Sequence, residues 1–236
     1  MLDLSVQVVQ FETQTAPLVP VSLRYATAWD VPQVFPVTCT PLATGNASLG
    51  TGYAASFDDV SCVTPGGHIA AIMLDDATGG PDVLAYTMND RRLPFGCWSG
   101  GNTCTLSAVK VFVLDRSTLD AWKTQIRGVD WSTHGLVAAT FRDTNGNGVA
   151  GVTPRLRGIF DESPHNAIPG GEVFFLSDDR LSIVPGATKT GASGGAVLLV
   201  VAGLSTRMSG AHPAITWSEL GVASAADTVF FEEFDP

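Results

Sequence analysis

Residues 135–152 limit the folds open to this chain more than any other segment does. They form an apolar run, a turn rich in Asp, Asn and Gly, and a second run that opens at Val152. An Asn-Gly pair accepts a positive φ at low cost, so the two pairs that begin at Asn145 and Asn147 indicate a tight reversal between two strands. The segment therefore predicts two strands joined by a tight turn, and it says more about architecture than about chemistry.

Short runs of the same kind recur along the chain and predict further strands. Residues 6–11 and 19–25 alternate apolar with polar side chains. Later runs, split by Gly, Pro, Asp and Ser, begin at Glu172, Leu181, Gly195, Ala214 and Thr228. This rhythm favours a β-sandwich or barrel over a parallel sheet, which needs a helix after most strands. We therefore expect an all-β fold.

Two sequence echoes predict a pair of related modules. In the first echo, Phe11 aligns with Phe141 and residues 21–24 align with 152–155. In the second, residues 65–76 align with 169–179. The spacing between the echoes differs, which indicates an insertion in the first module.

One short helix is expected between the modules. A capping-box-like start at Ser117 leads into apolar residues at helical spacing, and Gly128 ends the run. We expect an N-terminal β-sandwich module over residues 1–109, a strand and linker helix over 110–134, and a C-terminal β-sandwich module over 135–236.

The net charge of the chain limits the classes of partner that it can bind. Its 23 Asp and Glu residues against 13 Lys and Arg give a net charge of −10. Nucleic acid and anionic lipid repel such a chain, so cations and uncharged partners are the natural ligands. No apolar run reaches the roughly 20 residues that a membrane-spanning helix needs. We expect no nucleic-acid partner and no membrane-spanning segment.

The four cysteines all lie in the first half of the chain: Cys39, Cys62, Cys97 and Cys104. The absence of a Cys-x-x-Cys pair counts against a zinc ribbon or a thioredoxin-type centre. Their grouping predicts disulfides Cys39–Cys62 and Cys97–Cys104 in an oxidising compartment, with the other pairings and four free thiols as alternatives. The first residues lack the pattern of a signal peptide, so an exported protein would have lost its leader.

Motifs in the second half follow one another in a characteristic order. They are Asn147-Gly-Val-Ala-Gly-Val152, then Val173-Phe-Phe-Leu, then Thr188-Lys-Thr-Gly-Ala-Ser-Gly-Gly. This order resembles the carboxypeptidase-regulatory-like modules and the related prealbumin-like and B-type repeats of bacterial surface proteins. The resemblance implies Ig-like Greek-key sandwiches that act as spacers or envelope modules without catalysis. Some relatives form Lys–Asn isopeptide bonds, but no lysine precedes Lys110 and residues 135–236 offer only Lys189, so that property is not carried over.

The turn at Asp143 also matches the first half of an EF-hand-type calcium loop. Asp143, Asn145 and Asn147 supply oxygens at positions 1, 3 and 5, and a glycine stands at position 6. Position 12, where such a loop has a bidentate Glu, is Pro154. The ligands Asp161, Glu162, Asp178 or Asp179 would have to complete the shell. The alternative is a polar hairpin turn, which needs the same residue types.

The sequence contains two further candidate sites, a nucleophile loop and a sugar-stacking tryptophan. Gly191-Ala-Ser-Gly-Gly resembles the nucleophile loop of chymotrypsin-like proteases, with Ser193 as nucleophile and His68 and Asp75 or Asp115 in the required order. A Thr-Gly-x-x-Gly turn explains the same letters without catalysis. Trp98 lies beside the predicted Cys97–Cys104 loop and is the candidate for stacking on a sugar.

The last strand, residues 228–234, carries apolar side chains on both faces. Either the chain itself covers both faces, or one face meets another subunit, and we expect the second. We therefore expect a bacterial, non-enzymatic, secreted or cell-envelope β-sandwich protein with a structural, adhesive or self-assembling role, through protein or glycan contacts. A calcium- or carbohydrate-binding module and a Ser193 protease are the alternatives.

Overall fold

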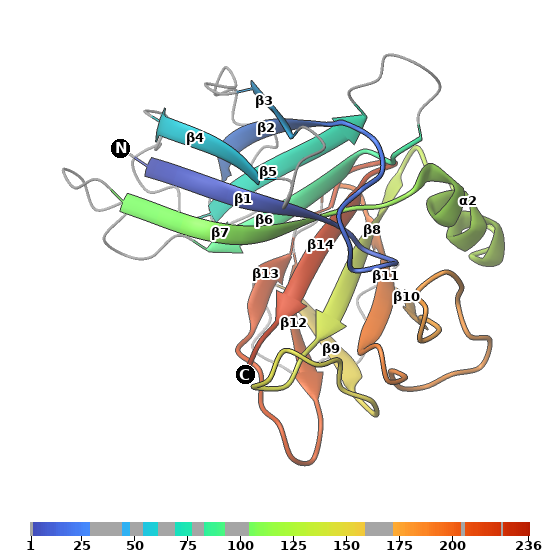
Figure 1. Ribbon diagram of the computed structural model, residues 1–236. Helices are drawn as coiled ribbons and strands as arrows, with labels where there is room; N and C mark the ends of the chain where they lie inside the picture. The colour runs from blue at the N-terminus through green and yellow to red at the C-terminus, as the bar shows by residue number, and fades with distance from the viewer. Residues whose placement is uncertain are drawn as a thin grey trace. The chain divides into compact units, whose positions relative to one another are not determined.

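The computed structural model describes residues 2–28, 44–47, 54–60, 69–76, 83–92, 104–158, 172–203, 206–222 and 224–236. Strands dominate these residues and one α-helix accompanies them (Figure 1), which confirms the all-β class. The chain divides into two compact units, Met1–Arg116 and Ser117–Pro236. In the described part of the chain, no helix is long and apolar enough to cross a membrane.

Unit 1, residues 1–116, contains seven described strands arranged in two sheets. They are β1 (Leu2–Gln10), β2 (Val21–Ala28), β3 (Thr44–Ala47), β4 (Ala54–Val60), β5 (Ile69–Asp76), β6 (Thr87–Arg92) and β7 (Cys104–Val113). One sheet has the order β4-β1-β7, and the other strands follow the order β6-β5-β2-β3. Strand β1 is antiparallel to β4 and parallel to β7.

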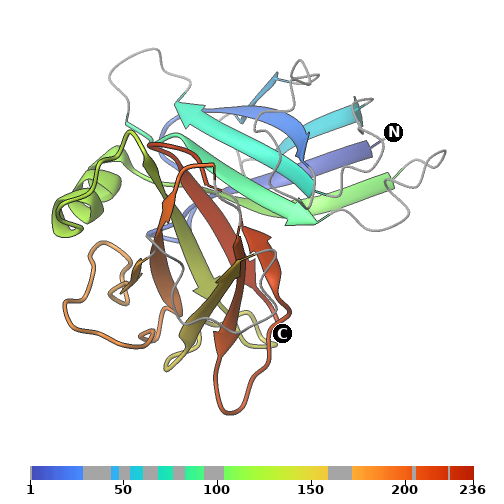
Figure 2. The same ribbon diagram turned by 180° about the vertical axis from the view of Figure 1, so that it is seen from behind.

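Unit 2, residues 117–236, also contains seven described strands. They are β8 (His134–Phe141), β9 (Thr153–Gly158), β10 (Glu172–Phe175), β11 (Gly195–Val201), β12 (Thr206–Ala211), β13 (Leu220–Val222) and β14 (Val229–Phe234). Four of them follow the order β10-β11-β8-β14, and a second sheet, seen from behind in Figure 2, has the order β13-β12-β9. The helix α2 (Arg116–Gln125) precedes these strands and buries Leu119 and Trp122.

The two units share one pairing pattern in six of their seven described strands. In each, the first strand pairs antiparallel with the fourth and parallel with the seventh (β1 with β4 and β7, β8 with β11 and β14). In each, the second, fifth and sixth strands form an antiparallel set (β2-β5-β6, β9-β12-β13). Only the third strand differs, because β3 pairs with β2 whereas β10 pairs with β11. The chain is thus an internal repeat at the level of strand order.

The first sequence echo follows this repeat, and the second does not. Phe11 comes directly after β1 and Phe141 ends β8, so the two residues occupy matching places in the units. Residues 69–76 form the fifth strand of unit 1, whereas 172–175 form the third strand of unit 2. The second alignment was therefore wrong, because a Pro-Gly-Gly turn marks where a strand begins and not which strand it is.

Aromatic side chains fill each unit's core. In unit 1, the rings of Phe11 and Phe112 meet edge to face with centroids 5.7 Å apart. In unit 2, Phe141 stacks on Phe234 at 4.7 Å and meets Trp217 edge to face at 5.3 Å. A Cβ on Gly210 of β12 would lie 2.7 Å from the Phe141 ring, so the second sheet of unit 2 approaches this ring too closely for any larger residue.

The last strand corrects one expectation of the sequence analysis. Phe230, Phe231 and Phe234 of β14 are each at most 1% exposed. Both faces of β14 are therefore covered within the chain, and the strand presents no apolar face for a second subunit.

Candidate functional site

The most distinctive structural feature of each unit is the parallel pairing of its first strand with its last. In unit 1 the pairing runs from Leu2 opposite Cys104 to Gln10 opposite Val113, with one irregularity between Leu4 and Val6. The amide of Phe11 extends it by donating to the carbonyl of Val113 at 2.8 Å. We call β1 and β7 the terminal pair of unit 1.

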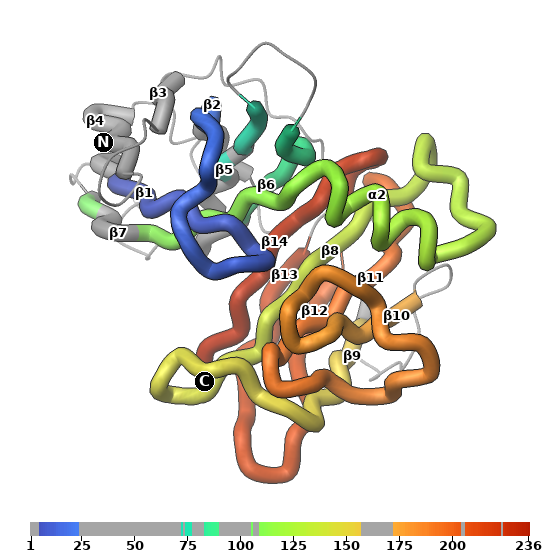
Figure 3. Tube along the Cα trace, turned by 45° about the vertical axis from the view of Figure 1, so that its right-hand side comes forward, coloured from blue at the N-terminus to red at the C-terminus, as the bar shows by residue number. Residues whose placement is uncertain are grey.

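The terminal pair of unit 2 is β8 with β14, which run side by side in Figures 1 and 3. Its register is uninterrupted from Leu136 opposite Val229 to Phe141 opposite Phe234. Backbone hydrogen bonds continue the ladder at both ends, from Leu136 N–H to the Thr228 carbonyl (3.0 Å) and from Arg142 N–H to the Phe234 carbonyl (2.9 Å). The near-continuous apolar sequence of β8 fits a strand buried on both faces.

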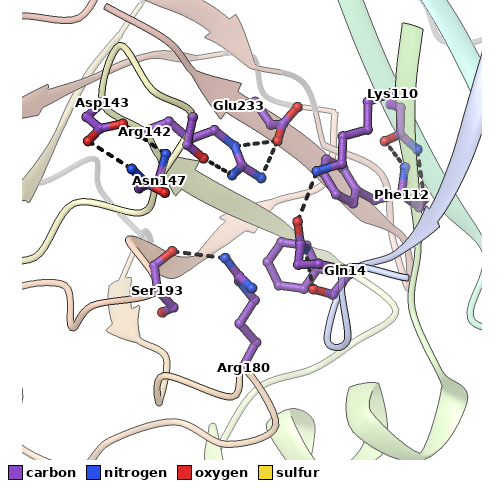
Figure 4. Close-up of polar contacts among 12 residues, drawn as sticks. Gln14, Lys110, Phe112, Arg142, Asp143, Asn147, Arg180, Ser193 and Glu233 are labelled. Atoms are coloured by element: carbon purple, nitrogen blue, oxygen red, sulfur yellow. Dashed lines mark hydrogen bonds and ion pairs between the residues drawn. The ribbon is translucent and has the colours of Figure 1, made fainter. Parts of the chain in front are cut away.

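Polar side chains secure the end of the unit 1 terminal pair. The Glu12 carboxylate accepts a hydrogen bond from the Asp115 amide at 2.9 Å, although the residue is only 7% exposed. Lys110 donates to the side-chain oxygen of Gln14 at 3.0 Å, as Figure 4 shows. Burial raises the pKa of the Asp115 carboxyl, and a hydrogen bond with Gln10 opposes part of that shift. We call Glu12, Gln14, Lys110 and Asp115 the unit 1 clasp.

Two buried side chains of β6 also hold the unit 1 pair from the other sheet. The Asn89 amide group accepts from the Phe112 N–H at 2.6 Å and donates to the Phe112 carbonyl at 2.9 Å. The Thr87 hydroxyl donates to the same carbonyl at 3.0 Å. Asn89 thus takes the place of a neighbouring strand for one residue of β7, and its buried polar atoms are satisfied by doing so.

An ion pair secures the corresponding end of unit 2. Arg142, directly after β8, donates through Nε to Glu233 of β14 at 2.7 Å and lies 2.6 Å from it through Nη2 (Figure 4). Both side chains are at most 13% exposed. Arg142 also donates to the Gly146 carbonyl at 2.6 Å, and its own carbonyl accepts from the Trp217 indole at 2.8 Å. We call Arg142 and Glu233 the unit 2 clasp.

The three predicted calcium ligands lie in the turn beside this clasp. The Asp143 carboxylate accepts from the amides of Asn145 (2.8 Å) and Asn147 (2.9 Å) and from the Asn147 side chain at 3.4 Å. These hydrogen bonds, the one from the Asn147 backbone first, lower the pKa of the Asp143 carboxyl. Gly146 has φ +80°, as the Asn-Gly signal predicts. The geometry is that of a self-contained polar turn.

The residues proposed to complete a calcium shell make other contacts or lie outside the residues that the structure describes. Asp178 accepts from the Ser193 amide at 3.2 Å, and Asp179 accepts from the Leu181 amide at 3.0 Å. Asp161 and Glu162 fall outside the described residues. Within the described ranges, no three His, Cys, Asp or Glu side chains are grouped to hold a metal ion. Calcium binding stays a prediction.

Ser193 is held in its turn by four hydrogen bonds. Its hydroxyl donates to the Ser177 carbonyl at 3.3 Å and accepts from the Gly195 amide at 3.2 Å. Its carbonyl accepts from buried Arg180 at 3.0 Å (Figure 4). Its amide, which a protease would aim at the oxyanion, is bonded to the Asp178 carboxylate. A backbone donor that already binds a carboxylate is not open to a substrate, so these contacts favour the structural-turn alternative for Ser193; His68 lies outside the described residues.

The other predicted site residues are not tested. Cys39, Cys62, Cys97 and Trp98 lie outside the described residues, and Cys104 opens β7. The disulfides and the sugar-stacking role of Trp98 stay predictions. Sequence reasoning missed Asn89 and both clasps, because polar residues at the end of a strand look the same whether they face solvent or a buried backbone group.

Comparison with known proteins gives no family. No family model matches the chain, and no curated protein matches it. Among solved structures, it is similar to the Bacillus anthracis TIE protein (TM-score 0.29, 10% identity, 98% of this chain and 33% of that one). It is also similar to the minor pilin GBS52 of Streptococcus agalactiae (TM-score 0.29, 12% identity, 100% of this chain and 96% of that one). A third similar structure is the shaft pilin SpaA of Lactobacillus rhamnosus GG (TM-score 0.26, 10% identity, 99% of this chain and 97% of that one). The chain spans about a third of the first of these. TM-scores this low carry no argument, so the fold class is based on the strands themselves.

Proposed function

We propose that this chain is a non-enzymatic structural protein of the cell surface or of secreted material, whose two units join the partners attached at its ends. The observation that carries the proposal is that six of the seven described strands of each unit repeat one pairing pattern. Repetition of a module sets a spacing and a direction, which a spacer or envelope protein needs and a single catalytic site does not.

The use of polar residues supports the same role. The buried or half-buried polar groups described above bond to backbone groups or to one another at the ends of strands and in turns. Such contacts stabilise an architecture and do not point reactive atoms into a cavity. The net charge of −10 and the predicted disulfides fit an extracellular compartment with protein or glycan partners.

Self-association of the chain is retained as a proposal, although β14 does not supply its surface. Sedimentation of the full chain over a range of concentrations tests it. A monomer at every concentration removes self-assembly and leaves the structural role intact.

The decisive experiment for the structural role asks whether Ser193 reacts. Purified full chain is treated with a fluorophosphonate probe beside a Ser193→Ala variant, and antibodies to the chain are applied to intact source cells. We expect no covalent labelling of either protein and surface labelling of the cells. Stoichiometric labelling that Ser193→Ala abolishes would overturn the proposal in favour of the hydrolase.

A further inference from the structure

We propose that the two terminal pairs make each unit a tension-resisting element, so that the chain bears mechanical load between its ends. This inference is based on the proposed structural function and adds the physical task that such a protein performs. It starts from the parallel pairing of the first and last strands, which both units share.

Parallel pairing fixes the direction of load. When two strands run parallel, the start of one and the end of the other lie at opposite ends of the pair. A pull on the start of β8 and the end of β14 therefore draws the two strands past each other along their length. The register from Leu136–Val229 to Phe141–Phe234 is then loaded all at once. In an antiparallel hairpin pulled at its open end, the same kind of bonds would break one after another.

The connectivity places both terminal pairs in series. Tension that enters through β1 crosses the first pair and leaves through β7, and the chain then continues into α2 and β8. It crosses the second pair and leaves through β14. Along the chain, both pairs therefore lie on the path between its two ends.

Burial keeps water from replacing the bonds of the loaded ladder. Residues 136–141 of β8 are at most 1% exposed, and Phe230 and Phe231 of β14 are equally buried. A hydrogen bond that breaks in such a place leaves a donor and an acceptor without solvent, which raises the cost of the first step of separation. In unit 1, Gln7 of β1 and Thr105 of β7 are exposed, and the register is irregular between Leu4 and Val6. We therefore expect unit 1 to yield at the lower force.

The clasps join the strands that sliding would separate. Arg142 follows the end of β8 and Glu233 lies near the end of β14, so their ion pair spans the two strands that tension separates. Glu12 and Asp115 follow the ends of β1 and β7 and are bonded to each other in the same position of unit 1. Each clasp adds a bond between the two strands of its terminal pair.

The test is single-molecule pulling of the full chain in two directions. Handles are attached first at the two termini, and then at azide-bearing residues placed at positions 132 and 202. Those positions adjoin the open end of the antiparallel β8–β11 pair, where Ala202 N–H donates to the Thr133 carbonyl. The unit pulled has the same stability in both cases, and only the direction of load differs.

Under reducing conditions, which remove the predicted disulfides, we expect terminal pulling to give two unfolding events, each releasing about 400 Å of chain at roughly 3.5 Å per residue. The force for unit 2 should be several-fold higher from the termini than from positions 132 and 202. Arg142→Met should lower only the higher-force event. The matched control Arg207→Met removes the exposed Arg207–Glu219 pair, which lies outside the terminal pairs, and should change neither event.

Equal forces in the two directions, or a lower force from the termini, would overturn the inference. That result would leave the absence of Ser193 labelling untouched, so it is distinguishable from a failure of the structural role itself. If Ser193 were labelled while the unfolding force still depended strongly on the pulling direction, the structural role would fail and the mechanical inference would stand.

Discussion

Units 1 and 2 pair six of their seven strands in the same way and differ only in the pairing of the third strand. The third strand of unit 1, β3, has the sequence Thr-Gly-Asn-Ala and pairs with β2, whereas β10 of unit 2 has the sequence Glu-Val-Phe-Phe and pairs with β11. A short outer strand without a large apolar side chain has a weakly specified register, whereas Phe175 in β10 is anchored by burial. The comparison teaches that the six shared strands define the topology and that a short outer strand joins whichever sheet its side chains fit.

The units also secure the same place with different chemistry. Unit 1 holds its terminal pair through side chains that bond to the backbone, from Asn89 and Glu12. Unit 2 uses an ion pair between Arg142 and Glu233 and the indole of Trp217. The topology fixes where along the terminal pair a side-chain contact is needed, but it does not fix which residues make that contact.

The largest expected effect comes from the aromatic cores. Phe141 packs against the rings of Phe234 and Trp217 and lies close against Gly210 of the second sheet, so Phe141→Ala should open a cavity in unit 2 and cost it more than Phe11→Ala costs unit 1. Losses of about 3–5 kcal/mol are usual for a buried Phe truncated to Ala. Hydrogen exchange of peptides from residues 104–115 and 134–142 reports the two units separately. Phe141→Leu is the control and should lose less; equal losses for both alanine variants would break the comparison.

A smaller effect is expected from the buried polar contacts. Asn89→Ala leaves the Phe112 N–H buried without its acceptor, which should cost unit 1 about 1–3 kcal/mol. Trp217→Phe removes one donor to the Arg142 carbonyl and keeps the ring, so the loss in unit 2 should be nearer about 1 kcal/mol. Urea unfolding monitored by the same peptides measures both. Thr87→Val is the control: it removes only the Thr87 donor to the Phe112 carbonyl and keeps Asn89, so it should lose less than Asn89→Ala, and an equal loss would contradict the hydrogen-bond account.

Acid should shift the stability of the units in opposite directions. The pKa of the Asp143 carboxyl is lowered in the folded state. Its contribution to the stability of unit 2 is therefore fully present above pH 3.8 and is lost as the pH falls through the lowered pKa. The Asp115 pKa is raised, so unit 1 loses stability as the pH rises from 3.8 through the raised value. Exchange rates measured from about pH 6 to about pH 3 should therefore show unit 2 weakening relative to unit 1.

Asp115→Asn supplies the control for this pH dependence. The variant should abolish the shift in unit 1 and leave the shift in unit 2. A shift of the same sign in both units would refute the assignment of these two carboxyls.

Calcium should have the smallest effect of all. The Asp143 carboxylate already accepts hydrogen bonds from Asn145 and Asn147, so calcium must compete with the bonds that shape the turn. We expect the melting temperature to be the same with calcium and with a chelator. A rise with calcium that Asp143→Ala removes would restore the calcium-binding alternative and would make unit 2 a ligand-dependent module.

Much of the fold could be predicted from the sequence because strands and turns are local. The Asn-Gly pairs placed the turn after β8, and helical spacing placed α2 within a few residues. The pairing of strands could not be predicted, because the parallel partner of β1 lies about a hundred residues away in β7 and no local signal connects them. The apolar faces of β14 indicated burial, but they did not tell whether the chain or a second copy covers them.

The candidate site was harder to predict than the fold. Asp143 was found by its pattern, yet the same pattern serves a turn and a calcium loop. Asn89 lies in the polar run Thr-Met-Asn-Asp-Arg-Arg, which by composition reads as an exposed strand. Its burial depends on the Phe112 backbone across the unit, and such a partner is visible only in three dimensions.

The pairing of first and last strands also governs how the protein is made. Neither unit can complete the sheet that contains its first strand until its last strand has left the ribosome, which for unit 1 means residues 104–113 and for unit 2 means 229–234. Contacts between such distant residues form slowly. Each unit should therefore stay unfolded during most of its synthesis, and a chain that remains unfolded while it lengthens is one that an export channel can still thread.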